Sequence, residues 1–108
     1  MTTPRQKTLN ENRTADAKIA AAILQAQADN RLPVCPTNLA GSGIDLLDDR
    51  ERGFGFGIRT DLNWRKITKS FRRIARMGAI VTLDESGMAR RKKYWINSTS
   101  DLRDIAAA

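Results

Sequence analysis

Residues 62–83, LNWRKITKSFRRIARMGAIVTL, constrain the fold of this 108-residue chain more strongly than any other stretch. On a helix, which advances about 100° per residue, the apolar side chains of this stretch fall within one arc about 100° wide. They are Trp64, Ile67, Phe71, Ile74 and Ala75. The basic side chains gather on the opposite side, with Arg65, Lys69, Arg72 and Arg76 in the middle and Lys66 and Arg73 beside them. The stretch therefore predicts an amphipathic helix that rests on a core by one face and presents cations on the other.

A β-hairpin is predicted directly after this helix. Gly78 is placed to end the helix in the left-handed conformation, and residues 79–83 include the β-branched side chains that strands favour. Residues 84–87, Asp-Glu-Ser-Gly, are turn formers, and residues 90–97, RRKKYWIN, form the matching second strand. Because side chains alternate along a strand, Tyr94 and Trp95 are expected on opposite faces, and the four bases before them are divided between the two faces.

The remaining predicted elements are short and lie on either side of these two. Residues 1–13 are polar and are expected to form a flexible N-terminal arm. A first helix over residues 15–29, capped by Asn12 or Thr14, has an alanine-rich surface that suits core packing or contact with a second copy. The other expected elements are a short turn over 37–40, a helix over 44–52 capped by Ser42, and a last helix over 101–107 capped by Ser98 or Ser100. Asp61 or Asn63 is the expected cap of the long helix.

The charge of the chain favours a polyanionic partner. Nineteen Lys and Arg against 12 Asp and Glu give a net charge of +7, which favours nucleic acid or an anionic membrane surface. Residues 59–76 carry seven bases and one acid, whereas residues 29–57 carry five acids and three bases and are expected to lie away from nucleic acid. No acid stands between Asp61 and Asp84, so no local i,i+4 ion pairs are expected to neutralise the long helix.

Several classes of function are disfavoured. The chain has no histidine and a single cysteine, Cys35, which is interpreted as a small buried filler, so no catalytic residue, metal site or disulfide is predicted. Residues 53–58 alternate glycine with apolar residues but lack the spacing of a nucleotide-binding loop, and no cofactor or small-molecule substrate is predicted. The longest charge-free run, residues 32–44, is interrupted by prolines and glycines, so a cytoplasmic protein without a membrane span is expected.

The predicted order of helix, short element, helix, long cationic helix and two-stranded hairpin resembles the winged helix-turn-helix superfamily. The specific match is residues 70–97, in which RIARMGAI (73–80) is similar to the end of the recognition helix in small prokaryotic MarR-like regulators of phage or plasmid type. Residues 84–91 match the tip of the wing. The resemblance implies a mainly α fold with a small β-hairpin (α+β), with three core helices and a two-stranded wing over 14–97 and a C-terminal tail or short helix over 98–108. Residues 31–59 depart from the pattern, because they are longer and richer in glycine than a compact second helix with a tight turn.

The resemblance implies a sequence-specific transcriptional regulator, most simply a repressor, that inserts the long helix into the major groove of double-stranded DNA. Base readout is expected from the N-terminal half of the helix, through Arg65, Lys66 and Lys69, with Thr68 and Ser70 as secondary candidates. Phosphate contacts are expected from Arg72, Arg73 and Arg76. The wing is expected to touch the flanking backbone or minor groove through two of its four bases, Arg90, Arg91, Lys92 and Lys93. A palindromic target would imply a homodimer, formed through the first helix or the C-terminal segment.

Two other functions stay open on the sequence. A winged-helix surface can also serve as a protein-interaction module or an inhibitor, and here its partner would be an acidic protein. Binding of RNA or single-stranded nucleic acid would use exposed aromatic rings as stacking platforms. However, Trp64 and Phe71 share the apolar arc of the long helix and are expected in the core, which leaves few rings for stacking.

Overall fold

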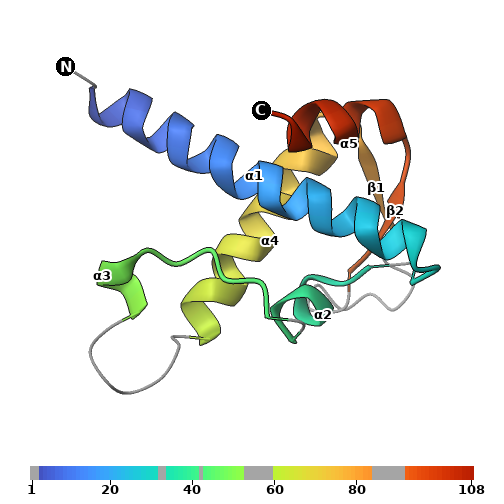
Figure 1. Ribbon diagram of the computed structural model, residues 1–108, viewed down its shortest axis with the longest axis horizontal. Coiled ribbons are helices and arrows are strands. Elements are labelled where there is room, and N and C mark those ends of the chain that lie inside the picture. Colours follow the sequence, from blue (N-terminus) through green and yellow to red (C-terminus); the bar gives the residue numbers. More distant parts are fainter. Residues whose placement is uncertain (1–2, 32–33, 42, 53–59, 84–91) are drawn as a thin grey trace.

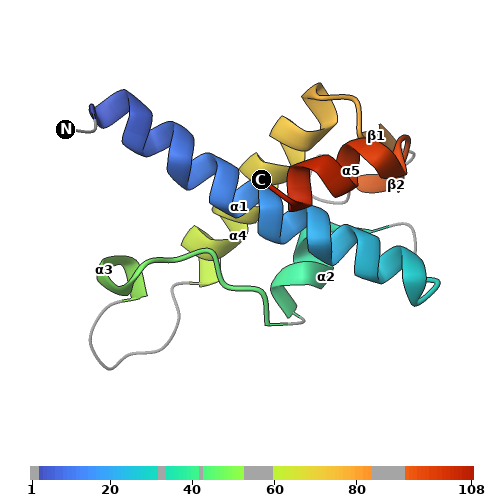
Figure 2. The same ribbon diagram turned by 45° about the horizontal axis from the view of Figure 1, so that its top comes forward.

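The computed structural model describes residues 3–31, 34–41, 43–52, 60–83 and 92–108. Its elements are α1 (Pro4–Ala28), α2 (Pro36–Gly41), α3 (Asp49–Arg52), α4 (Thr60–Arg76), β1 (Ile80–Leu83), β2 (Lys93–Ile96) and α5 (Thr99–Ala106). The described part of the chain is mainly helical with a two-stranded antiparallel sheet, so the α+β prediction is confirmed. α1 crosses α4 and has α5 packed along it, while the sheet lies beside the C-terminal half of α4 (Figures 1 and 2).

The core lies where α1, α4, α5 and the sheet meet. The apolar arc predicted for the long helix is the face that α4 buries, since Ile67, Phe71 and Ile74 are fully buried. α1 contributes Ile19 and Ile23 from the face that its alanines flank. Burial of each such side chain contributes about 1.5–3 kcal/mol to folding. Among the described residues, no helix combines the length and apolar character needed to span a membrane.

α1 begins much earlier than the sequence suggested. Thr3 is its N-cap: the Thr3 hydroxyl accepts the Gln6 N–H at 3.1 Å, and the Gln6 side chain accepts the Thr3 N–H at 3.1 Å. This capping box, followed by Pro4 in the first turn, is a strong helix start. The prediction of a flexible arm over 1–13 is therefore wrong for the described residues from Pro4 on. The first ten residues of α1, 4–13, extend beyond the core, and we call them the α1 overhang (Figure 1).

The segment before α4 is less helical than predicted. Helix was expected over 44–52, but α3 covers only Asp49–Arg52. The buried side chain of Asn63 explains the difference: its Oδ1 accepts the Leu46 N–H and its Nδ2 donates to the Ile44 carbonyl, both at 2.8 Å. Asn63 therefore holds residues 44–46 in a non-helical conformation, from within α4 and not as its cap. The short turn expected over 37–40 is present as α2.

The end of α4 and the hairpin follow the sequence closely. Gly78 adopts a φ of +85°, the left-handed conformation expected of the glycine that ends the helix. β1 and β2 pair antiparallel with Val81 opposite Trp95 and Thr82 opposite Tyr94. Tyr94 is buried against Phe71, with ring centroids 4.5 Å apart, and Trp95 is exposed on the other face, as alternation predicts.

Val34 pairs with the hairpin on the far side of β2 as an isolated bridge to Tyr94. The Val34 N–H donates to the Tyr94 carbonyl at 3.1 Å, and the Tyr94 N–H donates to the Val34 carbonyl at 2.9 Å. Val34 is buried, whereas the neighbouring Cys35 is only half-buried and so is not the fully buried filler expected. β2 consequently lies between Val34 and β1.

The C-terminal segment is part of the packed body. Ser98 caps α5 by accepting the Asp101 N–H at 3.2 Å, which confirms one of the two expected caps. Leu102 of α5 is fully buried in the same cluster as Ile19 and Phe71. The alanine side chains Ala20 and Ala26 of α1 are buried as well. The two segments considered for a dimer contact, the first helix and the C-terminal segment, thus pack against each other within one chain.

Candidate nucleic-acid interface

Four basic side chains form a line along the exposed side of α4. They follow one another at spacings of four, three and four residues, which places them within about 60° on the helix. All four are exposed, and within the described ranges none of them forms an ion pair. We call this set the cationic row: Arg65, Lys69, Arg72 and Arg76.

The two basic residues beside the row are neutralised by acids from other elements. The Lys66 ammonium forms a close ion pair with the Glu51 carboxylate of α3. Glu51 is held in place by Asp48, whose N–H donates to the Glu51 side chain at 3.1 Å and whose carboxylate accepts the Glu51 N–H at 2.9 Å. The acidic segment therefore lies against α4 through Glu51.

Arg73 is paired with a buried carboxylate of α1. Its Nη2 lies 2.8 Å from Asp16 Oδ1, and its Nε donates to the two Asp16 oxygens at 3.0 and 3.1 Å. The hydroxyl of Ser70, also buried, donates to Asp16 Oδ1 at 2.7 Å. These bonds satisfy the Asp16 carboxylate inside the protein. Arg73, predicted as a phosphate contact, is part of the contact between α1 and α4.

The absence of acids after Asp61 in the α4 sequence did not leave all of its cations unpaired. Lys66 and Arg73 find Glu51 and Asp16 through the fold, at sequence separations that a helical i,i+4 rule does not cover. Thr68, the secondary candidate for base readout, donates its hydroxyl to the Trp64 carbonyl at 2.9 Å. The fold thus divides the predicted site residues of α4 into an exposed row and residues with internal partners.

The predicted wing residues lie only partly within the described structure. Arg90 and Arg91 fall outside the described residues, as does the turn at 84–87. Lys92 is half-buried, and Lys93 is exposed on β2. By alternation Lys93 shares the outer face of the hairpin with Trp95, which pairs across the strands with the exposed Val81. The described part of the hairpin therefore presents one exposed cation, Lys93, on the same face as an exposed aromatic ring.

Two aromatic residues have environments that the sequence did not specify. Trp64, expected in the core, is half-buried, and its indole Nε1 is buried without a hydrogen-bond partner in the described part of the chain. Burial raises the pKa of the Tyr94 hydroxyl above its ordinary value of 10.0. The charge of Arg72 and a hydrogen bond with Thr82 oppose this shift, and Cys35 adds to it.

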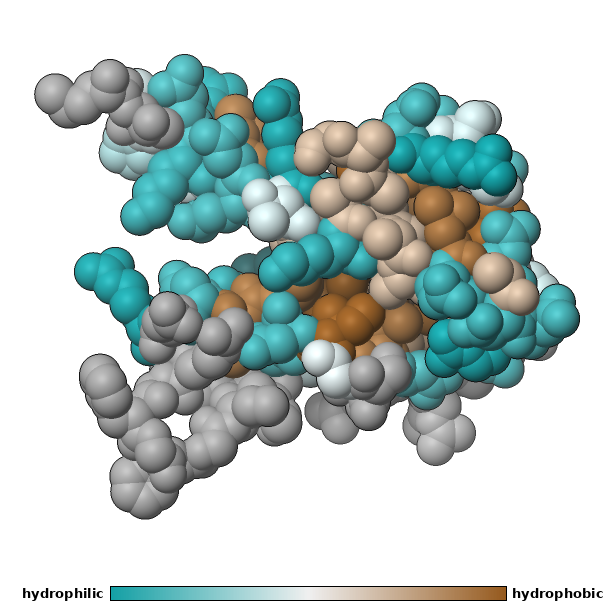
Figure 3. Space-filling model, viewed as in Figure 1, coloured by the Kyte–Doolittle hydropathy of each residue, from teal (hydrophilic) through white to brown (hydrophobic). Residues whose placement is uncertain are grey.

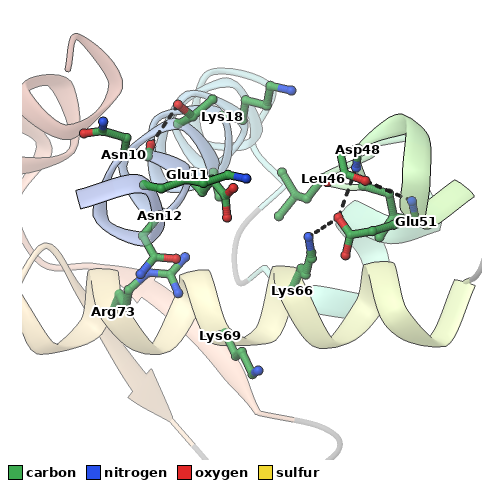
Figure 4. Close-up of a pocket in the computed structure, with 14 residues that line it drawn as sticks. Asn10, Glu11, Asn12, Lys18, Leu46, Asp48, Glu51, Lys66, Lys69 and Arg73 are labelled. Carbon is green, nitrogen blue, oxygen red and sulfur yellow. Dashed lines mark hydrogen bonds and ion pairs between the residues drawn. The ribbon is translucent and has the colours of Figure 1, made fainter. Parts of the chain in front are cut away.

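A cleft of about 660 Å³ lies beside α4, between α1 and the segment that contains α3. Figure 3 shows it as a hollow with hydrophilic rims, on the side where the α1 overhang extends from the body. Glu11 of α1 points into it towards Leu46 on the opposite wall (Figure 4). The residues that line it are Lys7, Asn10, Glu11, Asn12, Thr14, Ala15, Lys18, Leu46, Leu47, Asp48, Glu51, Lys66, Lys69 and Arg73.

Sequence reasoning missed this cleft because its walls come from segments far apart in the chain. One signal was present: Lys7, Glu11, Thr14 and Lys18 recur at spacings of four, three and four residues, the pattern of one helix face. That pattern has meaning only if residues 4–13 are helical.

Among the described residues, no cluster of three or more His, Cys, Asp or Glu side chains is placed to hold a metal ion. Comparisons of the chain with protein-family models, curated proteins and solved structures give no match.

Proposed function

We propose that this protein binds double-stranded DNA in a sequence-specific manner and regulates transcription, most simply as a repressor that acts by occupying its site. The cationic row carries the proposal. Four exposed bases on one line of a 17-residue helix form a rigid positive ridge, and an α-helix of this kind fits the major groove of B-DNA. No carboxylate in the described part of the structure neutralises this ridge.

The two halves of the row would have different tasks. Arg65 and Lys69 lie on the N-terminal half of α4 and would reach base edges, Arg65 by a forked contact to a guanine. Arg72 and Arg76 lie nearer the C-terminal end and would contact phosphates, which fixes the register without reading sequence. Lys66 and Arg73, expected from the sequence to read bases and contact phosphates, would not act as part of the row in this proposal, because Glu51 and Asp16 hold them.

The order of elements supports a winged-helix arrangement as part of this proposal. A long first helix, a short α2, a one-turn α3 and the long α4 are followed by an antiparallel hairpin, with Val34 adding an extended segment beside β2. The connection between α2 and α4 is longer than a tight turn and is held by Asn63. In this arrangement the hairpin would act as the wing, with Lys93, Lys92 and the neighbouring Arg90 and Arg91 touching the flanking backbone or minor groove.

Titration of a labelled duplex at several salt concentrations tests the proposal. Affinity should fall steeply with salt, with a log–log slope of about −0.9 for each phosphate neutralised, and excess single-stranded DNA or RNA should compete poorly. Selection of bound duplexes from a random pool should then yield a consensus, and a symmetric one would indicate a dimer. If no duplex is bound even at low salt, the proposal is wrong, and a winged-helix module that binds an acidic protein becomes the better candidate.

A further inference from the structure

We infer that the cleft beside α4 receives one sugar–phosphate strand of the same duplex, held by Lys7 and Lys18 of α1, on the flank of α4 where Lys69 lines the cleft. This inference rests on the proposed function, and it assigns to α1 a role in DNA binding in addition to its place in the core. The volume of the cleft, about 660 Å³, lies within the range typical of ligand sites, about 300–1,000 Å³.

The position of the cleft follows from the geometry of a helix in the major groove. The groove is about 12 Å wide and a helix with its side chains is about 10–12 Å across, so a phosphate strand flanks the helix on each side. On a helical projection, Lys69 lies at the edge of the cationic row nearest to Lys66 and Arg73, and these three residues line the cleft. The cleft therefore runs along one flank of α4, where one of the two strands would pass.

The charges around the cleft favour a phosphate strand once internal pairs are taken into account. Glu51 is engaged by Lys66, and Arg73 is engaged by Asp16 behind the cleft wall. Lys7, Lys18 and Lys69 have no ion-pair partner among the described residues. The neutral side chains on the same wall of α1, Asn10 and Asn12, can donate hydrogen bonds to phosphate oxygens.

Two carboxylates oppose this net attraction, and one of them gives a direct test. Asp48 is engaged by the backbone N–H of Glu51. Glu11 points into the cleft and has no ion-pair partner in the part of the chain that is described (Figure 4). A phosphate strand in the cleft would be repelled by the Glu11 carboxylate, so removal of that charge should tighten binding.

The α1 overhang gives a second, independent reason to expect a partner here. Every residue from Pro4 to Glu11 is exposed, so this part of α1 is helical by continuity with the packed part of the helix and leaves its side chains open to a partner. The overhang carries Arg5, Lys7 and Arg13 against Glu11, so its own charge favours an anionic partner. A strand that passes between the overhang and α4 would contact both.

The test compares single-charge variants of the full chain by duplex titration at several salt concentrations. Lys18→Gln should weaken binding about three- to tenfold and reduce the log–log salt slope by about 0.9, whereas Glu11→Gln should strengthen binding by a similar factor. Arg103→Gln, an exposed base on α5, is the matched control and should change affinity less than twofold, since exposed charges beyond about 8–10 Å are screened at physiological salt. All three variants should melt at the parent temperature, because the substituted side chains are exposed.

Failure of this inference can be told apart from failure of the proposed function. If Arg65→Ala and Arg72→Ala weaken binding while Lys18→Gln and Glu11→Gln behave like Arg103→Gln, the cleft carries no strand and DNA binding by the cationic row stands. If the parent protein binds no duplex at low salt, the proposed function itself is wrong. Weaker binding of Glu11→Gln would also overturn the inference, because it would assign that carboxylate a favourable contact.

Discussion

At the scale of single residues, the pair formed by Asp16 and Arg73 shows why partners must be known before a charged side chain is given a role. The Asp16 side chain is 5% exposed, and the Arg73 side chain is 24% exposed. Arg73 can therefore turn its head group to water if it loses its partner, whereas Asp16 cannot. The two ends of the same ion pair should respond differently to truncation.

We expect Arg73→Ala to destabilise the protein more than Asp16→Ala. Removal of Arg73 leaves a buried carboxylate with the Ser70 hydroxyl as its remaining bond, which costs about 3–5 kcal/mol, while Asp16→Ala should cost about 1–3 kcal/mol. Urea denaturation of both variants measures the difference in free energy of unfolding. Equal costs would contradict this difference between the two ends of the ion pair, and a stable Arg73→Ala with weaker DNA binding would return Arg73 to the role of a phosphate contact.

The division of the cationic row into base and phosphate contacts makes a second prediction. Arg65→Ala should cost about 1–3 kcal/mol of binding to the preferred duplex and relax the preference at one base pair. Arg72→Ala should weaken binding to all duplexes alike and reduce the salt slope by about 1. Titration of preferred and scrambled duplexes separates the two effects. Unchanged discrimination in Arg65→Ala would show that this residue does not read bases.

At the scale of elements, α4 is the part that sequence predicted best, because its faces and its end depend on local rules. The 3.6-residue period placed Ile67, Phe71 and Ile74 in the core, and Gly78 ended the helix as expected. The helical start at Thr3 was missed although its capping box and Pro4 are also local signals. Polar composition outweighed them, since residues 4–13 have almost no apolar face to bury.

The helix end at Gly78 can be tested in isolation from packing. A Cβ atom at Gly78 would meet no other atom within 4 Å, so substitution strains only the backbone at its φ of +85°. Gly78→Ala should therefore cost about 1 kcal/mol, and Gly78→Asn should cost less, because asparagine tolerates the left-handed conformation better. Thermal or urea unfolding measures both. A cost of several kcal/mol for alanine would indicate that the side chain collides with the hairpin.

At the scale of the whole molecule, the features that sequence could not supply are those that join distant segments. Asn63 was read as a helix cap, but it bonds to the backbone at Ile44 and Leu46, and that contact prevents the helix predicted over 44–52. Asp16 and Glu51 reach across the fold to neutralise two of six cations on α4. The cleft depends on the same long-range arrangement. A single sequence encodes these contacts but offers no period or spacing from which they can be derived.

The buried tyrosine links the packing of the whole domain to pH. Burial raises the pKa of Tyr94 in the folded protein above 10.0, the value that the unfolded chain is expected to have. The resulting stabilisation is complete below about pH 10 and is lost as the pH rises through the folded pKa. Tyr94 is the only tyrosine in the chain, so the near-ultraviolet absorbance of tyrosinate reports on it alone.

We therefore expect the tyrosinate signal of the native protein to appear above pH 10, and the melting temperature to fall over the same range. Tyr94→Phe is the control: it should lose about 0.5–1.5 kcal/mol at neutral pH with the hydrogen bond to Thr82, and its alkaline loss of stability should be smaller than that of the parent. A native titration midpoint at or below pH 10 would contradict the burial of this hydroxyl.

Removal of most of the α1 overhang separates stability from binding at the level of the whole domain. Deletion of residues 1–10 should cost less than about 1 kcal/mol, a shift in melting temperature below roughly 4–8 °C, because the buried side chains of α1 begin at Asp16. Asn12 or Thr14 can cap the shortened helix. Duplex affinity should nevertheless fall and the salt slope should become shallower, since Lys7 and its neighbour Arg5 are lost. Circular dichroism melting and salt-dependent titration measure the two effects.

A large loss of stability would show that the overhang packs on the body. An unchanged affinity would show that the overhang makes no contact with DNA.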